Sequence, residues 1–327
     1  MVRPGRRGFL IAAAVVLAAP GRGHAQTPAR IRTIGFMGAS SRTAQAEWTA
    51  AFVERLRELG WTEGQNIAIE YRWAEGRRDR FAEFAAEFVR RDVDVILTDG
   101  GGALAAKQAT STIPVVFAVA ADPLGMGVVS SLSRPGGNVT GSSVQASDTA
   151  GKRLQLLRET LPLLRRVAVL VNPNYRAAVL ETGEVEAAAQ KLGLEVIRAE
   201  IPRVEAIAPA IEGVKDRADA LYVCTDSFAN SNRELINSTA LTISLPTMHG
   251  FREMAMAGGL MSFGASLPGL FRRAAETVDK ILRGAKPADL PVEQPTTFDL
   301  VINLKTARAL GLSFPPSILV RADLIVE

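Results

Sequence analysis

The side chains that most often carry out catalysis are scarce in this 327-residue chain. Its two histidines are His24 and His249, and its one cysteine is Cys224. A histidine-based triad and a multi-histidine metal site each need several such groups around one atom, so neither can form from this set. The sequence also has no G-x-S-x-G, no phosphate-binding P-loop and no complete G-x-G-x-x-G. We therefore expect a protein that is not an enzyme and that needs no metal or cofactor.

Cys224 and His249 are interpreted as structural residues. Cys224 ends an apolar run at residues 220–224, where a buried and unreactive thiol is the expected state. A single cysteine forms no disulfide within the chain, so core packing must hold the fold. His249 could line a cleft, but a hydrogen-bonded structural histidine is the favoured interpretation.

Three aspartates, Asp99, Asp122 and Asp226, follow predicted strands. We expect Asp99 and Asp122 to cap helices, which is the ordinary role of a carboxylate after a strand. Asp226 follows the strand of the second half that corresponds to the strand before Asp99, so we expect it to pair with a ligand ammonium. The alternative is that Asp226 caps the helix after it.

A glycine-rich loop, formed by Gly100, Gly101, Gly102 and Ala103, follows Asp99. Apolar runs on either side have the length of buried strands, and the loops after parallel strands meet at one sheet edge, where ligands bind. Glycines let backbone amides approach a ligand closely, and amides at a helix N-terminus favour a carboxylate. We expect this loop and Asp226 to hold opposite ends of a zwitterion; the alternative is that the loop is only a tight turn.

Strand-like and helix-like segments alternate along both halves of the chain. The strands are predicted at residues 34–37, 67–73, 93–97, 115–119, 139–144, 167–171, 194–199 and 220–224. Amphipathic helices are predicted between them, for example at 48–59 and 81–88. This alternation predicts an α/β fold of two doubly wound parallel-sheet lobes with right-handed crossovers.

Turn-rich or extended segments at 134–141, 258–264 and 291–298 mark places where the chain crosses between the lobes. Lobe 1 is expected to contain residues 30–142 plus about 265–292, and lobe 2 residues 143–264 plus about 293–327. A multi-strand hinge of this kind predicts a cleft that closes on a ligand.

The first 25 residues are predicted to be a secretory signal peptide. Arg3, Arg6 and Arg7 precede an apolar stretch at 9–19, and small residues follow. The apolar stretch is too short to span a bilayer stably. The paired arginines fit a twin-arginine leader as well as an ordinary one. We expect the mature protein in the periplasm.

The basic excess of the chain belongs to this leader. The whole chain has 38 basic and 34 acidic residues, and the leader holds four arginines and no acid, which leaves 34 of each. A mature chain of zero formal net charge does not support nucleic-acid binding. We expect a monomer with a small-molecule partner.

Several runs of the sequence together carry a family resemblance. They are LGWTEGQNI at 59–67, EYRWAEG at 70–76, AAKQAT at 105–110, RPGGNVTG at 134–141, GLMS at 259–262 and LVINLKTA at 300–307. In these runs and their order the chain resembles substrate-binding proteins of ABC transporters in the tryptophan-binding-like family, whose fold is that of class I periplasmic binding proteins.

The resemblance implies capture of a small solute, in some relatives an aromatic amino acid, and delivery to an ABC permease driven by a cytoplasmic ATPase. A periplasmic ligand sensor for a membrane receptor is the second interpretation, and a secreted enzyme is the third. The residues that the resemblance places in the ligand site are Ser40, Ser41, Gly100, Gly101, Gly102, Ala103, Ala121 and Asp122 in lobe 1, Asn172, Tyr175, Asp226, Ser227, Phe228 and Phe251 in lobe 2, and Ser262 and Phe263 near the hinge.

Overall fold

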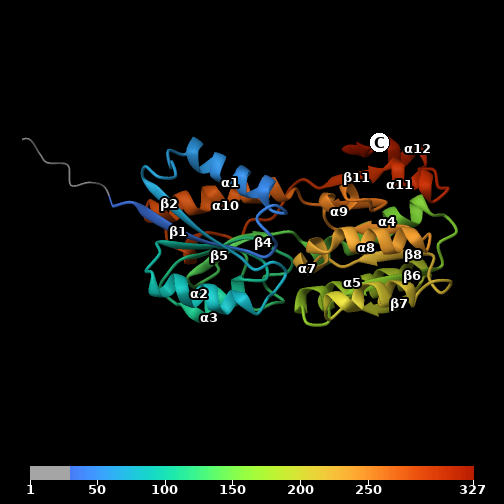
Figure 1. Ribbon diagram of the computed structural model, residues 1–327, viewed down its shortest axis with the longest axis horizontal. Helices are drawn as coiled ribbons and strands as arrows, with labels where there is room; N and C mark the ends of the chain where they lie inside the picture. Colours follow the sequence, from blue (N-terminus) through green and yellow to red (C-terminus); the bar gives the residue numbers. More distant parts are fainter. Residues whose placement is uncertain (1–29) are drawn as a thin grey trace, which may run out of the picture. The chain divides into compact units, whose positions relative to one another are not determined.

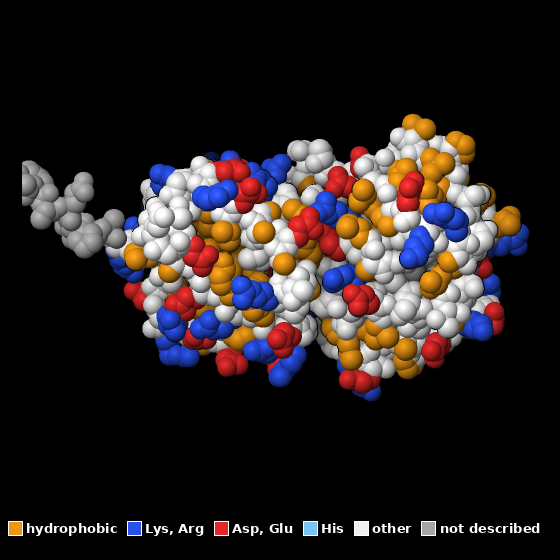
Figure 2. All heavy atoms as spheres, turned by 45° about the horizontal axis from the view of Figure 1, so that its top comes forward, with side chains coloured by type: hydrophobic (Ala, Val, Ile, Leu, Met, Phe, Trp, Pro, Cys, Tyr) orange, Lys and Arg blue, Asp and Glu red, His pale blue; other side chains and the backbone are white. Residues whose placement is uncertain are grey.

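Two β-sheets organise the chain in the computed structural model, which describes residues 30–327 (Figure 1). The expected leader at residues 1–25 lies outside the described residues, so it stays a prediction. None of the helices within residues 30–327 is both long and apolar enough to span a bilayer. Basic and acidic side chains are interspersed on the face that Figure 2 shows.

The first sheet is parallel throughout, with strand order β2-β1-β3-β4-β5. Strands β3 and β4 of this sheet are almost wholly buried because helices cover both faces of the sheet there. Their apolar sequences predicted this burial. The strands are β1 (Arg32–Gly38), β2 (Ile67–Trp73), β3 (Val95–Asp99), β4 (Val115–Ala120) and β5 (Val139–Ser143).

Four helices pack on this sheet, and we call the sheet with these helices lobe 1. They are α1 (Ala46–Glu58), α2 (Arg80–Arg90), α3 (Ala103–Ala109) and α10 (Leu267–Leu282). Helix α1 buries Trp48, Phe52 and Leu56 at helical spacing, and it ends before Gly60, which has a φ of +94° that favours glycine. Helix α10 comes from late in the sequence but packs on α1 and β4.

The second sheet has the order β12-β11-β10-β9-β8-β6-β7. Its strands are β6 (Arg166–Val171), β7 (Glu195–Glu200), β8 (Ala220–Val223), β9 (Thr247–His249), β10 (Met261–Gly264), β11 (Asp299–Asn303) and β12 (Leu324–Val326). The α/β fold class is confirmed, with one departure: β11 runs antiparallel to β10. The chain leaves β10 for α10 of lobe 1 and re-enters the second sheet from that side, so its direction is reversed.

Lobe 2 is the name used below for the second sheet with the remaining helices. These are α4 (Ala146–Thr160), α5 (Arg176–Leu192), α6 (Ile207–Glu212), α7 (Ser227–Ser231), α8 (Arg233–Thr242), α9 (Arg252–Met256), α11 (Leu304–Ala309) and α12 (Pro316–Leu319). Short 3₁₀ turns occur at Val204–Ala206 and Pro287–Asp289. Helices α4 and α5 pack against each other.

Three segments connect the lobes. The chain passes from β5 into α4 and from β10 into α10, and residues 290–298 then lead back from lobe 1 to β11 of lobe 2. The returning stretch lies beside β5, because Glu293 N–H donates to the Gly141 carbonyl at 2.8 Å and Ser143 N–H to the Glu293 carbonyl at 2.9 Å. Paired backbone strands of this kind form a hinge with few soft torsions between the lobes.

Candidate functional site

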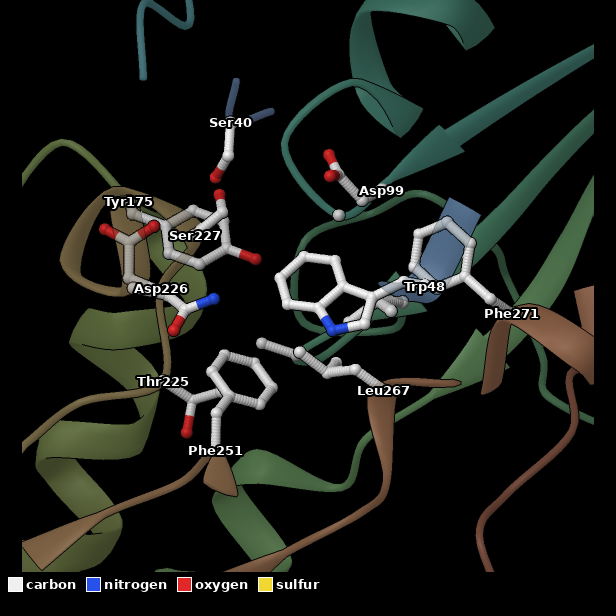
Figure 3. Close-up of a pocket in the computed structure, with 14 residues that line it drawn as sticks. Ser40, Trp48, Asp99, Tyr175, Thr225, Asp226, Ser227, Phe251, Leu267 and Phe271 are labelled. Atoms are coloured by element: carbon white, nitrogen blue, oxygen red, sulfur yellow. The ribbon is translucent and has the colours of Figure 1, made fainter. Parts of the chain in front are cut away.

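A cavity lies where loops after the strands of both sheets meet (Figure 3). It encloses about 450 Å³, part of which is open to solvent. Its walls are Ser40, Trp48, Asp99, Gly100, Val119, Ala121, Leu267 and Phe271 from lobe 1, and Tyr175, Thr225, Asp226, Ser227, Asn230 and Phe251 from lobe 2.

Seven residues of the predicted site line this cavity, namely Ser40, Gly100, Ala121, Tyr175, Asp226, Ser227 and Phe251. Each follows a strand of one of the sheets or sits at the start of the next helix. They come together because parallel strands deliver their following loops to one edge.

The other predicted residues lie outside the cavity wall. Gly102 and Ala103 turn toward the core, since a Cβ on Gly102 would meet Thr98 Oγ1 at 2.1 Å and Ala103 is fully buried. Phe263 stacks on Phe298, with ring centroids 5.7 Å apart. Those without a place in the wall are Ser41, Gly101, Gly102, Ala103, Asp122, Asn172, Phe228, Ser262 and Phe263.

One part of the cavity is apolar and aromatic. The Trp48 and Phe271 rings lie 6.0 Å apart, and Phe251 and Leu267 line the space beside the indole (Figure 3). Helical spacing marked Trp48 as a core residue, and no feature of the sequence distinguishes a core aromatic from one that also lines a cavity. The indole Nε1 also donates to Glu253 Oε1 of lobe 2 at 3.1 Å.

Asp99 is a buried carboxylate with one unpartnered oxygen. Its Oδ2 accepts hydrogen bonds from the backbone N–H of Ala39 at 3.0 Å and from Gln45 Nε2 at 2.8 Å, whereas Oδ1 has no hydrogen-bond partner among residues 30–327. Burial raises the pKa of Asp99 to about 6. The expected capping role is wrong: the residue at the α3 N-cap is Gly102, and no side chain caps that helix.

Asp226 has the capping role that was the alternative from sequence. Its Oδ1 accepts the N–H of Phe228 at 3.0 Å at the start of α7, and its Oδ2 accepts from Asn172 Nδ2 at 2.9 Å. Arg78 Nη2, from lobe 1, donates to the same Oδ1 at 3.3 Å. Pairing of Asp226 with a ligand ammonium stays a prediction, and Arg78 was not foreseen.

Asp122 also makes a local cap, although of a turn rather than a helix. Its Oδ1 accepts the N–H of Gly125 at 2.8 Å. This bond satisfies a backbone donor three residues on, but no helix follows in the structure, so the expected helix cap is a turn instead.

A buried ion pair supports the lobe 2 wall from behind. Arg153 of α4 contacts Glu181 of α5, and Arg153 is 1% exposed and Glu181 is 0% exposed. Glu181 Oε2 accepts the backbone N–H of Thr225 at 2.8 Å, and Arg153 Nη1 donates to Thr225 Oγ1 at 3.1 Å. The pair therefore positions the loop that carries Asp226.

The two residues interpreted as structural are buried away from the cavity. Burial raises the pKa of the Cys224 thiol well above its usual value, so the thiol is unreactive at neutral pH. His249 is fully buried, its Nε2 lies 2.9 Å from Thr247 Oγ1, and burial lowers its pKa to about 3. Within residues 30–327 no group of three or more His, Cys, Asp or Glu side chains is arranged to hold a metal ion.

Comparison with curated proteins and solved structures finds relatives along almost the whole described chain. A tyrosine-binding protein of Clostridioides difficile (strain R20291) is 28% identical over 262 residues, which cover 80% of this chain and 75% of that protein. The structure of an ABC domain in complex with L-Trp from Streptococcus pneumoniae is 27% identical, with a TM-score of 0.85 over 90% of this chain and 99% of that one.

A second solved structure differs more in shape at similar identity. The ligand-free, open structure of a substrate-binding protein with adhesive properties from Clostridium difficile is 25% identical, with a TM-score of 0.67 over 90% of this chain and 99% of that one. More distant solute-binding proteins share only the fold, which confirms the expected class I periplasmic binding protein architecture.

The family model described as ABC transporter substrate binding protein matches residues 37–326. This match covers both lobes and every residue of the cavity wall. The resemblance inferred from the sequence runs is thereby confirmed, and the chain belongs to the family of ABC transporter substrate-binding proteins.

Proposed function

We propose that this protein captures an aromatic amino acid in the cavity between its lobes and delivers it, as a monomer, to the permease of an ABC importer. The family membership supports a transport role. The relatives named for tyrosine and for L-Trp support an aromatic amino acid, and so does the aromatic part of the wall. A pocket with an apolar part and a few placed polar groups is typical of a small-molecule site.

The observation that carries the proposal is the unpartnered Asp99 oxygen in the wall of a mostly apolar cavity. A buried carboxylate is costly unless a cation or several donors meet it. Arg78 pairs with Asp226, and its charge also acts to lower the pKa of Asp99, but within residues 30–327 no cation forms an ion pair or a hydrogen bond with Asp99. A ligand ammonium is the group that completes the Asp99 site.

This assignment reverses the orientation expected from sequence. The ammonium lies at Asp99, beside the glycine loop, and the carboxylate points to the lobe 2 wall. There, Ser227 and Asn230 offer hydroxyl and amide donors. The ring occupies the space between Trp48 and Phe251.

Contacts between the lobes support closure around the ligand. Ser40 Oγ lies 2.5 Å from Ser231 Oγ, and Trp48 donates to Glu253. The higher TM-score with the L-Trp complex than with the ligand-free open structure fits the same interpretation, because the two have similar identity to this chain. Ligand then shifts the population toward the closed state.

Calorimetry and thermal unfolding of the purified mature protein test the proposal. L-Tyrosine, L-tryptophan and L-phenylalanine should raise the melting temperature, and a ligand at 100 times its Kd should add about 2.7 kcal/mol to the free energy of unfolding. L-Leucine and L-glutamate serve as controls for an apolar and an acidic side chain. Absence of any shift with all three aromatic amino acids would remove the proposal.

Export to the periplasm belongs to the same proposal, since the family works outside the cytoplasm. The leader at residues 1–25 should be removed, so that the periplasmic protein begins near Gln26. Mass spectrometry of the periplasmic fraction measures this terminus. An intact Met1 on protein found in the cytoplasm would contradict it.

A further inference from the structure

Arg78 reaches from lobe 1 to two residues of lobe 2. It lies in the turn between β2 and α2, and its guanidinium carbon is 3.8 Å from the centre of the Tyr175 ring. Its Nη2 is 3.3 Å from Asp226 Oδ1. The side chain is 27% exposed, whereas that of Asp226 is 2% exposed, so the guanidinium covers a carboxylate that solvent does not reach.

The same side chain separates two hollows. Tyr175 and Asp226 line the inner cavity described above. Arg78 lines a second, outer hollow together with Asn172 and Phe228, and this hollow encloses about 1140 Å³ against about 450 Å³ in the inner cavity, each including space open to solvent. Arg78 therefore stands between the ligand cavity and an open, solvent-filled space.

We propose that Arg78 seals the ligand cavity and sets how long a bound ligand stays. This rests on the proposed function, that the inner cavity holds an aromatic amino acid. Both Arg78 contacts join the lobes, so opening the cleft breaks them. They slow ligand release but have little effect on entry into the open cleft, because they form only after the ligand is inside.

The chemistry of the contact requires arginine in particular. A planar guanidinium stacks on an aromatic face and donates in its own plane at the same time, which an ammonium does not do. The stacking interaction is strongest where it is shielded from water, as it is over the buried Tyr175. Lysine at this position keeps the charge toward Asp226 but loses the stack.

Arg77 is a matched control in the same turn. Its Nη2 is 2.7 Å from Asp79 Oδ2, and both side chains are about two-thirds exposed, at 68% and 67%. It lines the outer hollow as Arg78 does, but its ion pair stays within lobe 1. Arg77→Ala therefore removes one arginine from the turn without removing a contact between the lobes.

The test follows dissociation of L-tryptophan and L-tyrosine by stopped-flow fluorescence in the wild type and three variants. Arg78→Ala should raise the dissociation rate by about 10-fold or more, in line with the loss of a shielded cation–π contact and a charged hydrogen bond, while the association rate stays similar. The dissociation rate of Arg78→Lys should lie between those of the wild type and of Arg78→Ala. The dissociation rate of Arg77→Ala should match that of the wild type. Equal dissociation rates for Arg78→Ala and Arg77→Ala would overturn the proposal.

A second measurement needs no ligand. Cysteines in place of Ser40 and Ser231, whose oxygens are 2.5 Å apart, should form a disulfide that holds the lobes closed. In this oxidised protein, Arg78→Ala should increase acrylamide quenching of tryptophan fluorescence, because Trp48 lines the unsealed cavity, and Arg77→Ala should not. Equal acrylamide quenching in the Arg78→Ala and Arg77→Ala proteins would overturn the proposal that Arg78 seals the cavity. If the wild type binds neither amino acid, the proposed function fails and this comparison alone decides the role of Arg78.

Discussion

Each lobe places an aspartate at or near the end of the strand beside its first strand, yet the two carboxylates have different contacts. Asp99 is the last residue of β3, and one of its oxygens has no partner in the described part of the chain. Asp226 follows β8 and accepts from Phe228, Asn172 and Arg78. The position in the fold brings both carboxylates to the cavity, and the neighbouring groups decide which of them is left for a ligand.

The supports behind the two carboxylates differ as well. Behind Asp226, the buried pair of Arg153 and Glu181 holds the backbone of Thr225. Behind Asp99, the support is neutral, consisting of the Gln45 amide and a backbone N–H. A charged support is costly to break, whereas a neutral one is replaced easily by water.

The largest expected effect comes from breaking the charged support. Glu181→Ala leaves Arg153 buried without its partner, and we expect the free energy of unfolding to fall by about 3–5 kcal/mol. Urea denaturation measures this. The matched change in lobe 1, Gln45→Ala, removes the hydrogen bond to Asp99 and a second one from the Ser40 N–H, and it should cost about 2 kcal/mol in total. Similar losses for both variants would mean that the two supports do not differ as described.

Asp99→Asn should abolish most of the ligand affinity. The ammonium loses its carboxylate inside a closed cavity, and truncating such a pair costs about 2–5 kcal/mol, or about 30-fold and more in Kd. Calorimetry with L-tryptophan or L-tyrosine measures it. The unliganded protein should be at least as stable as the wild type, because the variant removes a buried carboxylate that lacks a cation. Unchanged affinity would show that Asp99 does not bind the ammonium.

Acid should weaken ligand binding through the same residue. Burial raises the pKa of Asp99 from its ordinary range to about 6 in the unliganded fold, and the ammonium needs the ionised form. Ligand affinity should therefore fall by up to about tenfold for each pH unit below 6. The free energy of unfolding of the unliganded protein should rise as the pH falls from about 6 to about 4, because in this range Asp99 is protonated in the folded chain but still ionised in the unfolded chain. Calorimetry and thermal unfolding between pH 5 and about 7.5 follow both quantities. Asp99→Asn should remove both dependences, and a flat profile in the wild type would contradict the assignment.

Asp226→Asn should have the smallest effect. Asparagine is as good an N-cap as aspartate, so the start of α7 remains capped and stability should change by less than about 1 kcal/mol. Affinity should fall by about 1 kcal/mol, since Arg78 keeps its stack on Tyr175 and loses only a charged partner. A loss at Asp226 that exceeds the loss at Asp99 would restore the orientation expected from sequence.

Local sequence patterns were sufficient to predict the architecture of the fold and some of the residues that line the cavity. The alternation of apolar runs and amphipathic helices predicted two α/β lobes. The spacing of apolar residues along the chain shows directly which helix face, or which whole strand, is buried. Loops after strands were sufficient to predict Gly100 and Asp226 at the cavity, and the family resemblance added Ser40 and Tyr175. The capping role of Asp226 was also among the alternatives, since a cap depends on residues only two or three positions away.

Tertiary structure decided the rest, because those features depend on groups far apart in the sequence. Arg78 and Asp226 are 148 residues apart, and no local pattern indicates that they meet. Trp48 has the spacing of a core residue, and its place in the wall arises only when α10 and lobe 2 pack around it. Asp99 ends its strand where a helix-capping residue was expected, but it does not cap α3 because the backbone turns at Gly102 before that helix begins. Residue order thus determined which loops reach the cavity, whereas contacts across the cavity determined which carboxylate oxygens there are already paired.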